Sequence, residues 1–139
     1  MTQENPVVLI RLTEGRQVDE TNYASYAEQF ISEKGNEGKR RLKFPKLTTS
    51  KLRNIYSLIM NLYTKIECEE DFKRYKSELQ YLKTKMAYEA GRESAVRDFL
   101  DKTFLMRAIG NINNYEAFKL YCRYAESLVA YFKFYGGED

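Results

Sequence analysis

Apolar side chains recur at steps of three and four residues between positions 52 and 66, and this spacing constrains the fold more than any other feature of the sequence. They are Leu52, Ile55, Tyr56, Ile59, Leu62, Tyr63 and Ile66. Such a period places them along one face of an α-helix of roughly 16 residues. Thr48, Thr49 and Ser50 precede this face and supply hydroxyls that can cap a first helical turn. The pattern therefore predicts an amphipathic helix that begins at these hydroxyl residues.

The same helical period recurs along most of the chain. We expect further helices from just after Asp19 to about Lys34, from Glu69 to Ala90, from Arg92 to about Ala108 and from Tyr115 to Tyr135. With 139 residues, 43% of them apolar and only two of them proline, the chain can bury the core of one ordinary domain. The sequence therefore predicts an all-α fold, a single-domain bundle of about five helices that spans residues 1–139.

Two segments of this domain lack helical periodicity. Residues 1–18 are expected to be irregular, although Pro6 to Ile10 can form either an apolar anchor or a short extended piece. Residues 35–46 are expected to form a flexible loop, because Gly35 and Gly38 stop the preceding helix and Pro45 stands just ahead of the next cap. This loop contains most of the positive charge discussed next.

Positive charge is concentrated in one short part of the chain. The net charge is only +3, yet residues 39–53 hold seven of the 23 lysines and arginines and no acid, which leaves 16 cations against 20 acids elsewhere. The seven are Lys39, Arg40, Arg41, Lys43, Lys46, Lys51 and Arg53. A local concentration of this kind is typical of a site for a polyanion.

Some of these cations surround the start of the predicted helix at Thr48, where the helix dipole disfavours positive charge. Lys51, Arg53 and free backbone N–H groups make sense together if an anion such as phosphate binds there. The alternative is that both side chains simply point into water. Lys76, Lys83, Lys85, Arg92 and Arg97 would extend a basic track that contacts a nucleic-acid backbone, or they are ordinary solvated charges.

The chemistry of common enzymes is absent from the sequence. There is no histidine, which is the commonest general base near neutral pH, and no phosphate-binding loop, dinucleotide fingerprint or zinc-protease motif. Glu69, Glu70 and Asp71 fit a solvated helix start better than a metal cluster, and Cys122 fits a buried thiol better than a nucleophile. We therefore expect no catalytic residue, no metal, no cofactor and no small-molecule substrate.

No apolar run approaches the length of a membrane span, and no segment has the layout of a signal peptide. Cys68 and Cys122 lie far apart in sequence and do not suggest a disulfide framework. We therefore expect no membrane contact and a location in the reducing cytoplasm.

The chain is rich in aromatic residues, with twelve tyrosines and eight phenylalanines. Most fall on the predicted inward faces, so the core is the default interpretation. The run from Tyr131 to Tyr135 differs, because five consecutive aromatic and lysine residues cover every side of a helix. Tyr131, Phe134 and Tyr135 are therefore expected in a protein interface, with end-of-bundle packing or a stacking platform for bases as the alternatives.

Three segments resemble one known family. LTTSKLRNI (Leu47 to Ile55), YLKTKMAYEAGRE (Tyr81 to Glu93) and YCRYAESLVAYFKFYGGED (Tyr121 to Asp139) are similar to the small α-helical subunit of the type III-A CRISPR–Csm effector complex. The resemblance covers residues 47–139, about two-thirds of the chain, and is loose over the first 46 residues. Its one departure is Glu126-Ser127-Leu128, where Glu-Ala-Leu is expected; a small residue is kept there.

This resemblance implies a non-catalytic, five-helix subunit present in several stacked copies, as an inner filament beside the backbone subunits that hold the crRNA. It implies crRNA and target RNA, other copies of the chain, the backbone subunits and the large subunit as partners in antiviral defence. It also implies contact with the RNA duplex without reading its sequence, with Lys51 and Arg53 as contacts and Arg92 as a weaker candidate. Together with the loop cations, the expected RNA-binding residues are Lys51, Arg53, Arg40, Arg41, Lys43, Lys46, Lys83 and Arg92.

Two other functions fit the residues without the resemblance. A helical adaptor would bind an acidic protein through its basic loop, and its binding would depend on one protein partner rather than on nucleic acid. A small all-α enzyme is the third hypothesis, and the missing histidine and motifs argue against it.

Overall fold

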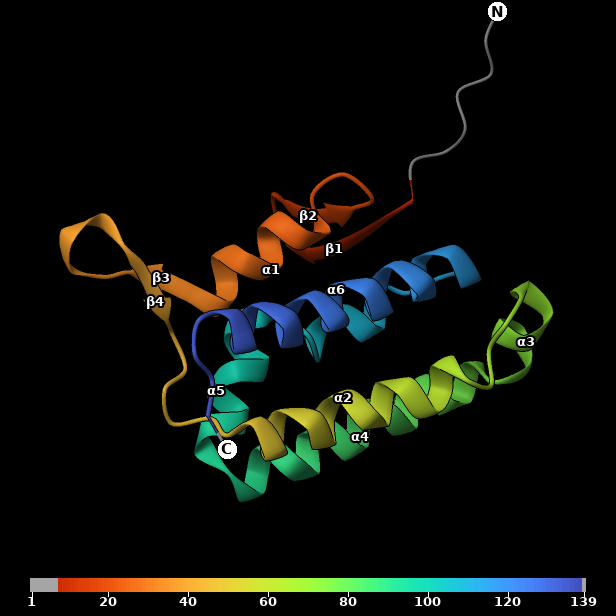
Figure 1. Cartoon of the computed structure of the whole chain (residues 1–139). Helices are drawn as coiled ribbons and strands as arrows, with labels where there is room; N and C mark the ends of the chain where they lie inside the picture. The colour runs from red at the N-terminus through yellow and green to blue at the C-terminus, as the bar shows by residue number, and fades with distance from the viewer. Residues whose placement is uncertain (1–7, 139) are drawn as a thin grey trace, which may run out of the picture.

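The computed structural model describes residues 8–138 as an elongated helical bundle with two small hairpins (Figure 1). The elements in chain order are β1 (Leu9–Thr13), β2 (Arg16–Asp19), α1 (Tyr23–Ile31), β3 (Ser32–Lys34), the 3₁₀ helix η1 (Asn36–Gly38), β4 (Arg40–Leu42), α2 (Thr49–Tyr63), α3 (Glu69–Arg74), α4 (Lys76–Arg92), α5 (Ser94–Thr103), the 3₁₀ helix η2 (Arg107–Asn111) and α6 (Tyr115–Phe134). The predicted all-α character of the single domain is confirmed, because both sheets have only two strands.

Helix α6 is the centre of the bundle. It packs against α1 and β1 on one side and against α2 on the other, and α4 lies beside α2 and α5. In Figure 1 the chain thus forms a layer of α1 and the first hairpin, a middle layer of α6, and a layer of α2 with α4. The hairpin of β3 and β4 extends from one end of the molecule, and α3 forms the other end.

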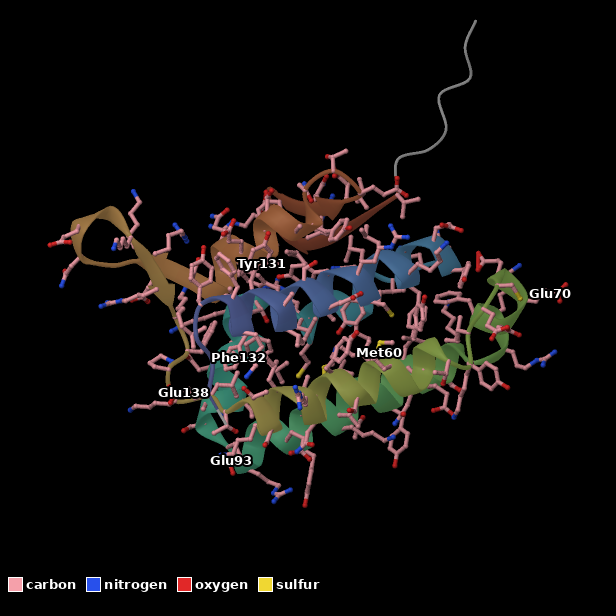
Figure 2. The ribbon with its side chains drawn as sticks, viewed as in Figure 1. Met60, Glu70, Glu93, Tyr131, Phe132 and Glu138 are labelled. Carbon is pink, nitrogen blue, oxygen red and sulfur yellow. The ribbon has the colours of Figure 1, made fainter. Side chains whose placement is uncertain are left out.

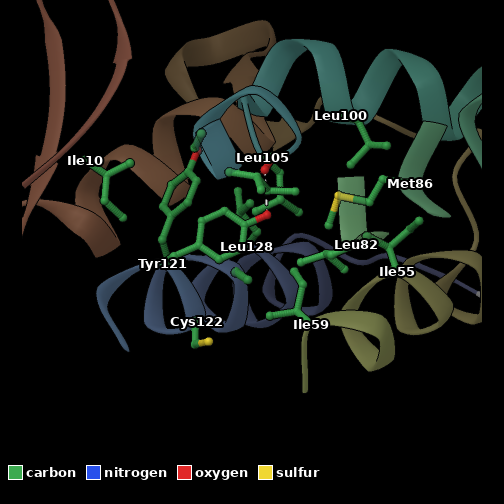
Figure 3. Packing of buried hydrophobic residues seen from close by; sticks show 14 of the residues in the cluster. Ile10, Ile55, Ile59, Leu82, Met86, Leu100, Leu105, Tyr121, Cys122 and Leu128 are labelled. Atoms are coloured by element: carbon green, nitrogen blue, oxygen red, sulfur yellow. Dashed lines mark hydrogen bonds between the residues drawn. The ribbon is translucent and has the colours of Figure 1, made fainter. Parts of the chain in front are cut away.

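The predicted periodicity of α2 is confirmed in the core. Leu52, Ile55, Ile59 and Leu62 are buried, and the chain continues to the buried Ile66. The Thr48 hydroxyl caps the helix by accepting a hydrogen bond from the Lys51 backbone N–H at 3.2 Å. Figure 3 shows how α2 side chains meet those of α4 and α6 in one continuous cluster, in which Met86, Leu82 and Leu128 are also buried.

Two buried tyrosines of α6 hold the turn that follows α5. The Tyr121 hydroxyl donates to the Leu105 carbonyl and the Tyr124 hydroxyl donates to the Thr103 carbonyl, each at 2.6 Å. Between these carbonyls, Phe104 has the left-handed φ of 61°. Burial raises the pKa of Tyr121 well above its ordinary value, because no charged form is tolerated there. Both hydroxyls therefore act as hydrogen-bond donors.

The structure corrects both predictions of irregular chain. Residues 9–18 are not irregular: β1 and β2 form an antiparallel hairpin that buries Ile10, Leu12 and Val18, and Gly15 has the positive φ of 83° that its turn requires. The extended alternative for Pro6 to Ile10 is thus confirmed for Leu9 and Ile10, while residues 1–7 lie outside the described residues. The basic loop 35–46 is also largely ordered, because β3 and β4 pair from Ser32↔Leu42 to Lys34↔Arg40.

Three predicted helix boundaries are wrong. The first helix ends at Ile31 instead of Lys34, because Ser32 enters strand β3. The predicted helix from Glu69 is divided at Tyr75 into α3 and α4, and the bend lets Phe72 of α3 pack against Phe118 of α6. The fourth helix stops at Thr103, because the left-handed Phe104 breaks it before the 3₁₀ helix η2.

Candidate nucleic-acid interface

The seven cations of residues 39–53 gather at one end of the molecule, which we call the basic end. It consists of the β3–β4 hairpin, the connection that follows, and the first turn of α2, and the C-terminus lies beside it (Figure 1). Antiparallel α4 brings the start of α5 to the same place. Figure 2 shows Glu93 and Glu138 at this end and Glu70 at the opposite one.

The first turn of α2 is already occupied by the C-terminal segment. The Thr49 backbone N–H donates to the Glu138 carbonyl at 2.9 Å, and the Lys51 N–H donates to Thr48. Lys133 Nζ donates to the Thr49 hydroxyl at 3.4 Å and to the Gly137 carbonyl at 3.2 Å. The backbone N–H groups of Thr49 and Lys51 are therefore not free to bind an anion, in contrast to the prediction. Any phosphate bound here would be contacted mainly by side chains.

Lys51 is held by a carboxylate in the structure. Its Nζ lies 2.8 Å from Glu93 Oε2, and both side chains remain substantially exposed. The hydrogen bond and the charge of Lys51 lower the pKa of Glu93 below its usual value. Part of the charge of Lys51 is therefore already neutralised by Glu93, which weakens any contact of this lysine with an anion.

A pocket of about 620 Å³ lies beside the Lys51–Glu93 pair. Its lining is mixed in charge: Lys43, Phe44, Pro45, Lys46, Leu47, Lys51, Glu93, Ser94, Ala95 and Asp98. Three lysines and two carboxylates line it, so its charge is nearly balanced and the pocket alone is unsuited to bind an anion. Glu93 and Asp98 lie far from residues 39–53 in the sequence, and only the bundle topology brings them to the basic end. The charge pattern of the sequence therefore did not indicate them.

Two arginines of the hairpin are also bonded within the chain. Arg40 Nε donates to the Ser32 hydroxyl at 2.7 Å and its Nη2 donates to the Ser32 carbonyl at 3.1 Å. Arg41 forms an ion pair with Glu33 at 2.9 Å across the hairpin. These contacts connect the two strands, so both arginines have a structural role whatever they bind.

The remaining predicted cations are differently placed. Among residues 8–138, no carboxylate lies within ion-pair distance of Lys43, Lys46, Arg53 or Lys83. Lys46 and Arg53 are exposed at the basic end, and Lys83 is exposed on α4. Arg92 lies 3.9 Å from Glu89 and places its guanidinium 5.6 Å from the Tyr88 ring centre. Lys46 and Arg53, together with the exposed Lys39 of the β3–β4 hairpin, are therefore the cations at this end most accessible to a ligand.

The aromatic end of α6 is only partly accessible. The Tyr135 hydroxyl donates to Glu28 Oε2 at 2.6 Å, which joins α6 to α1, and this bond raises the pKa of Tyr135. Tyr131 is half-buried against Tyr135, with ring centres 6.5 Å apart. Phe134 is 72% exposed and is the member of the predicted interface most available to another chain.

Two exposed tyrosines on α4 were missed as surface features. Tyr81 is 56% exposed and Tyr88 is 64% exposed. Each has a cation four residues later over its ring: Lys85 Nζ is 4.4 Å from the Tyr81 ring centre, and Arg92 is near Tyr88 as stated above. The helical spacing of residues 81, 85, 88 and 92 is the sequence signal for this outward face.

The described part of the chain holds no cluster of side chains that would bind a metal ion. Within residues 8–138, no three His, Cys, Asp or Glu side chains gather as a metal site would require. Cys122 is buried, and burial with the nearby Glu126 raises the pKa of its thiol to about 12, so it is a poor nucleophile. No helix among these residues is long and apolar enough to span a bilayer.

Comparisons with known proteins give a consistent result. The family model described as Csm2 Type III-A matches residues 24–138, beginning upstream of Leu47, where the resemblance started. The chain is 42% identical to the CRISPR system Cms protein Csm2 of Streptococcus thermophilus over 120 residues, which are 85% of this chain and 94% of that protein. It is 40% identical to the protein of the same description from Enterococcus italicus over 134 residues, 91% of this chain and 96% of that one. A third relative, from Mycobacterium tuberculosis, is 32% identical over 97 residues, 67% of this chain and 78% of its own length.

Proposed function

Because this chain belongs to the Csm2 Type III-A family, we propose that it contacts the crRNA–target RNA duplex of a Csm complex through its basic end, in several stacked copies. Membership makes it the small structural subunit of a type III-A CRISPR–Csm complex, a role that fits a non-enzyme. The RNA contact, the stacking and the part in antiviral defence are the content of the proposal.

The observation that carries this proposal is the distribution of cations at the basic end. Lys46 and Arg53 are exposed and without a carboxylate partner among residues 8–138, while the rest of the chain is net acidic. An A-form duplex presents phosphates and 2′-hydroxyls to a protein, whereas its deep major groove hides the base edges. A few flexible cations suit such a surface, since they contact the backbone without selecting a sequence.

Stacking supplies affinity that one copy lacks. A subunit that neutralises about two or three phosphates binds weakly at physiological salt. Copies held side by side along one duplex would bind it jointly and much more tightly. The exposed Phe134 supports such contacts with another copy or a backbone subunit, whereas Tyr135 already has an internal partner in Glu28.

The test is to replace Lys46→Gln together with Arg53→Gln in the assembled complex and measure target-RNA affinity against salt. We expect affinity to fall at least roughly tenfold, and the slope of log affinity against log salt to shrink by about two, since two phosphate contacts are lost. The matched control is Lys73→Gln with Arg74→Gln, two exposed cations of α3 at the far end.

Unchanged affinity and slope in the Lys46/Arg53 variant would refute RNA contact at the basic end. Loss of one protein partner from the complex without a change in RNA affinity would instead support the adaptor hypothesis for this surface. Equal losses in the test and control variants would show a general charge effect and would also count against the proposal.

A further inference from the structure

Helix α4 has an outward face on which tyrosines and cations alternate. The four residues Tyr81, Lys85, Tyr88 and Arg92, which we call the aromatic–cation stripe, follow one another at steps of four, three and four. Those steps keep all four on one side of the helix. The two tyrosines are seven residues apart, which is about 10 Å along a helix axis.

The tyrosine rings of the stripe have no role in the bundle. Both are more than half exposed, whereas the buried face of α4 consists of Leu79, Leu82 and Met86. In the described part of the chain, neither ring has an aromatic neighbour, and each instead lies near the cation four residues later. A substitution here would leave the core unchanged, so folding does not explain these two side chains.

The surface beside the stripe is open. Thr84, Ala87 and Gly91 are exposed, and a Cβ added at Gly91 would meet no atom within 4 Å. Small side chains therefore leave space beside Tyr88, and a flat ligand that stacks on its ring would lie next to the Arg92 guanidinium or displace it. The Lys51–Glu93 pair lies just beyond Arg92, so the stripe leads into the basic end.

The composition of the stripe favours nucleic acid over protein. Single-strand sites combine aromatic rings on which bases stack with cations that follow the phosphates. Protein interfaces also use Tyr and Arg, but they are depleted in Lys and have an apolar core. Residues 81–92 carry Lys83, Lys85 and Arg92 against the single acid Glu89, and their large aliphatic side chains are buried.

We infer that the aromatic–cation stripe is a stacking site for unpaired RNA bases, distinct from the duplex backbone contacts of the basic end. The spacing of about 10 Å corresponds to roughly three base steps of 3.4 Å. A strand of at least four nucleotides would thus reach both tyrosines, with Lys85 close to the phosphates between them and Arg92 close to the phosphate beyond Tyr88. This inference rests on the proposal that the chain binds RNA.

The chain has no tryptophan, so Tyr88→Trp would introduce a single fluorescent reporter. The probes are an unstructured single-stranded RNA of about 12 nucleotides and a blunt duplex of the same length, within the usual range of site sizes. We expect the single strand to quench the reporter and the duplex to leave it nearly unchanged. Tyr63→Trp is the matched control, because Tyr63 is 43% exposed on α2 but has no cation over its ring among residues 8–138.

Affinity for the single strand, measured by polarisation of labelled RNA, provides the second readout. Tyr81→Ala and Tyr88→Ala should each weaken it by roughly tenfold, in the range reported for loss of one stacked base. Tyr88→Phe keeps the ring and should bind within about twofold of the original chain, since stacking needs no hydroxyl.

Several results would overturn the inference. Absence of single-strand binding, or binding that neither quenches the Tyr88→Trp reporter nor depends on the two tyrosines, would do so. If the duplex still bound through Lys46 and Arg53, the proposed function would stand while the stripe lost its role. A reporter signal that changed with protein concentration alone would assign the stripe to a protein interface.

Discussion

The two ends of the molecule use charged side chains in opposite ways. At the acidic end, formed by Glu67, Glu69, Glu70 and Asp71, Glu69 Oε2 accepts a hydrogen bond from the Tyr115 backbone N–H at 3.0 Å. Asp71 Oδ2 accepts one from the Glu67 N–H at 3.1 Å. At the basic end, Lys46 and Arg53 have no such partner among residues 8–138. The fold thus gives Glu69 and Asp71 an internal role that it does not give to Lys46 and Arg53, so these two cations are the better indication of what the protein binds.

Among substitutions at the two ends, Gly137→Ala is expected to reduce the stability of the protein most. A Cβ at this position would overlap the ring of the buried Phe132, so the C-terminal turn or the Phe132 ring must shift, which disturbs the contact of this turn with Thr49. We expect a loss of about 1–3 kcal/mol in the free energy of unfolding, as is usual for overpacking. Hydrogen exchange at the Thr49 amide, which donates to Glu138, should accelerate while exchange at the Tyr115 amide stays unchanged.

The reciprocal change at the other end is Glu69→Ala. It removes the acceptor for the Tyr115 amide and a carboxylate from the first turn of α3, which together should cost about 1 kcal/mol. Chemical denaturation should show this loss, and exchange at the Tyr115 amide should accelerate. RNA affinity should not change; a clear reduction would mean that the acidic end also contributes to binding.

The smallest effect concerns Lys51, a basic-end cation that, like Arg41, has a carboxylate partner. Glu93→Gln removes the carboxylate that holds this lysine, so RNA affinity should rise by about two- to threefold, on the scale of an exposed ion pair. The conservative control is Asp98→Asn, which removes a carboxylate of the same pocket that pairs with Lys102 instead. If both variants gained equally, the cause would be net charge rather than release of Lys51.

The pH dependence of this gain has a defined sign. Lys51 lowers the pKa of Glu93, so the stabilisation from the pair is present above the ordinary pKa of a glutamate and is lost as the pH falls through the lowered value. Between pH 6 and 8 the carboxylate stays charged, and the difference between the original chain and Glu93→Gln should be constant. Acidification below the usual glutamate range should abolish the difference.

Long periodic segments were predictable because their pattern and their caps agree. The apolar face of α2, its cap at Thr48 and the inward residues of α6 followed directly from spacing. The hairpins were missed because strands of three to five residues leave little periodicity, and their turns depend on positive φ at Gly15 and Gly38. The break at Phe104 has no local signal, since its stabilising donors come from α6.

The sequence predicted where the cations of the candidate site lie but not which of them form ion pairs within the chain. Charge concentration identified residues 39–53, yet it could not separate Arg41 and Lys51, which have carboxylate partners, from Lys46 and Arg53. Glu93 reaches Lys51 only because α2 and α4 run antiparallel. The exposure of Tyr81 and Tyr88 on α4 was not predicted, because aromatic residues at helical spacing usually belong to the buried face.

The two hydroxyls that hold the turn after α5 also limit how this chain can evolve. A change of Tyr121 or Tyr124 to phenylalanine would preserve the shape of the core but leave the carbonyl of Leu105 or Thr103 without its donor. Substitution at these positions is therefore restricted by a hydrogen bond rather than by volume. An aliphatic side chain in the same core can be exchanged for another of similar volume without such a loss, so these two positions are more restricted than their neighbours.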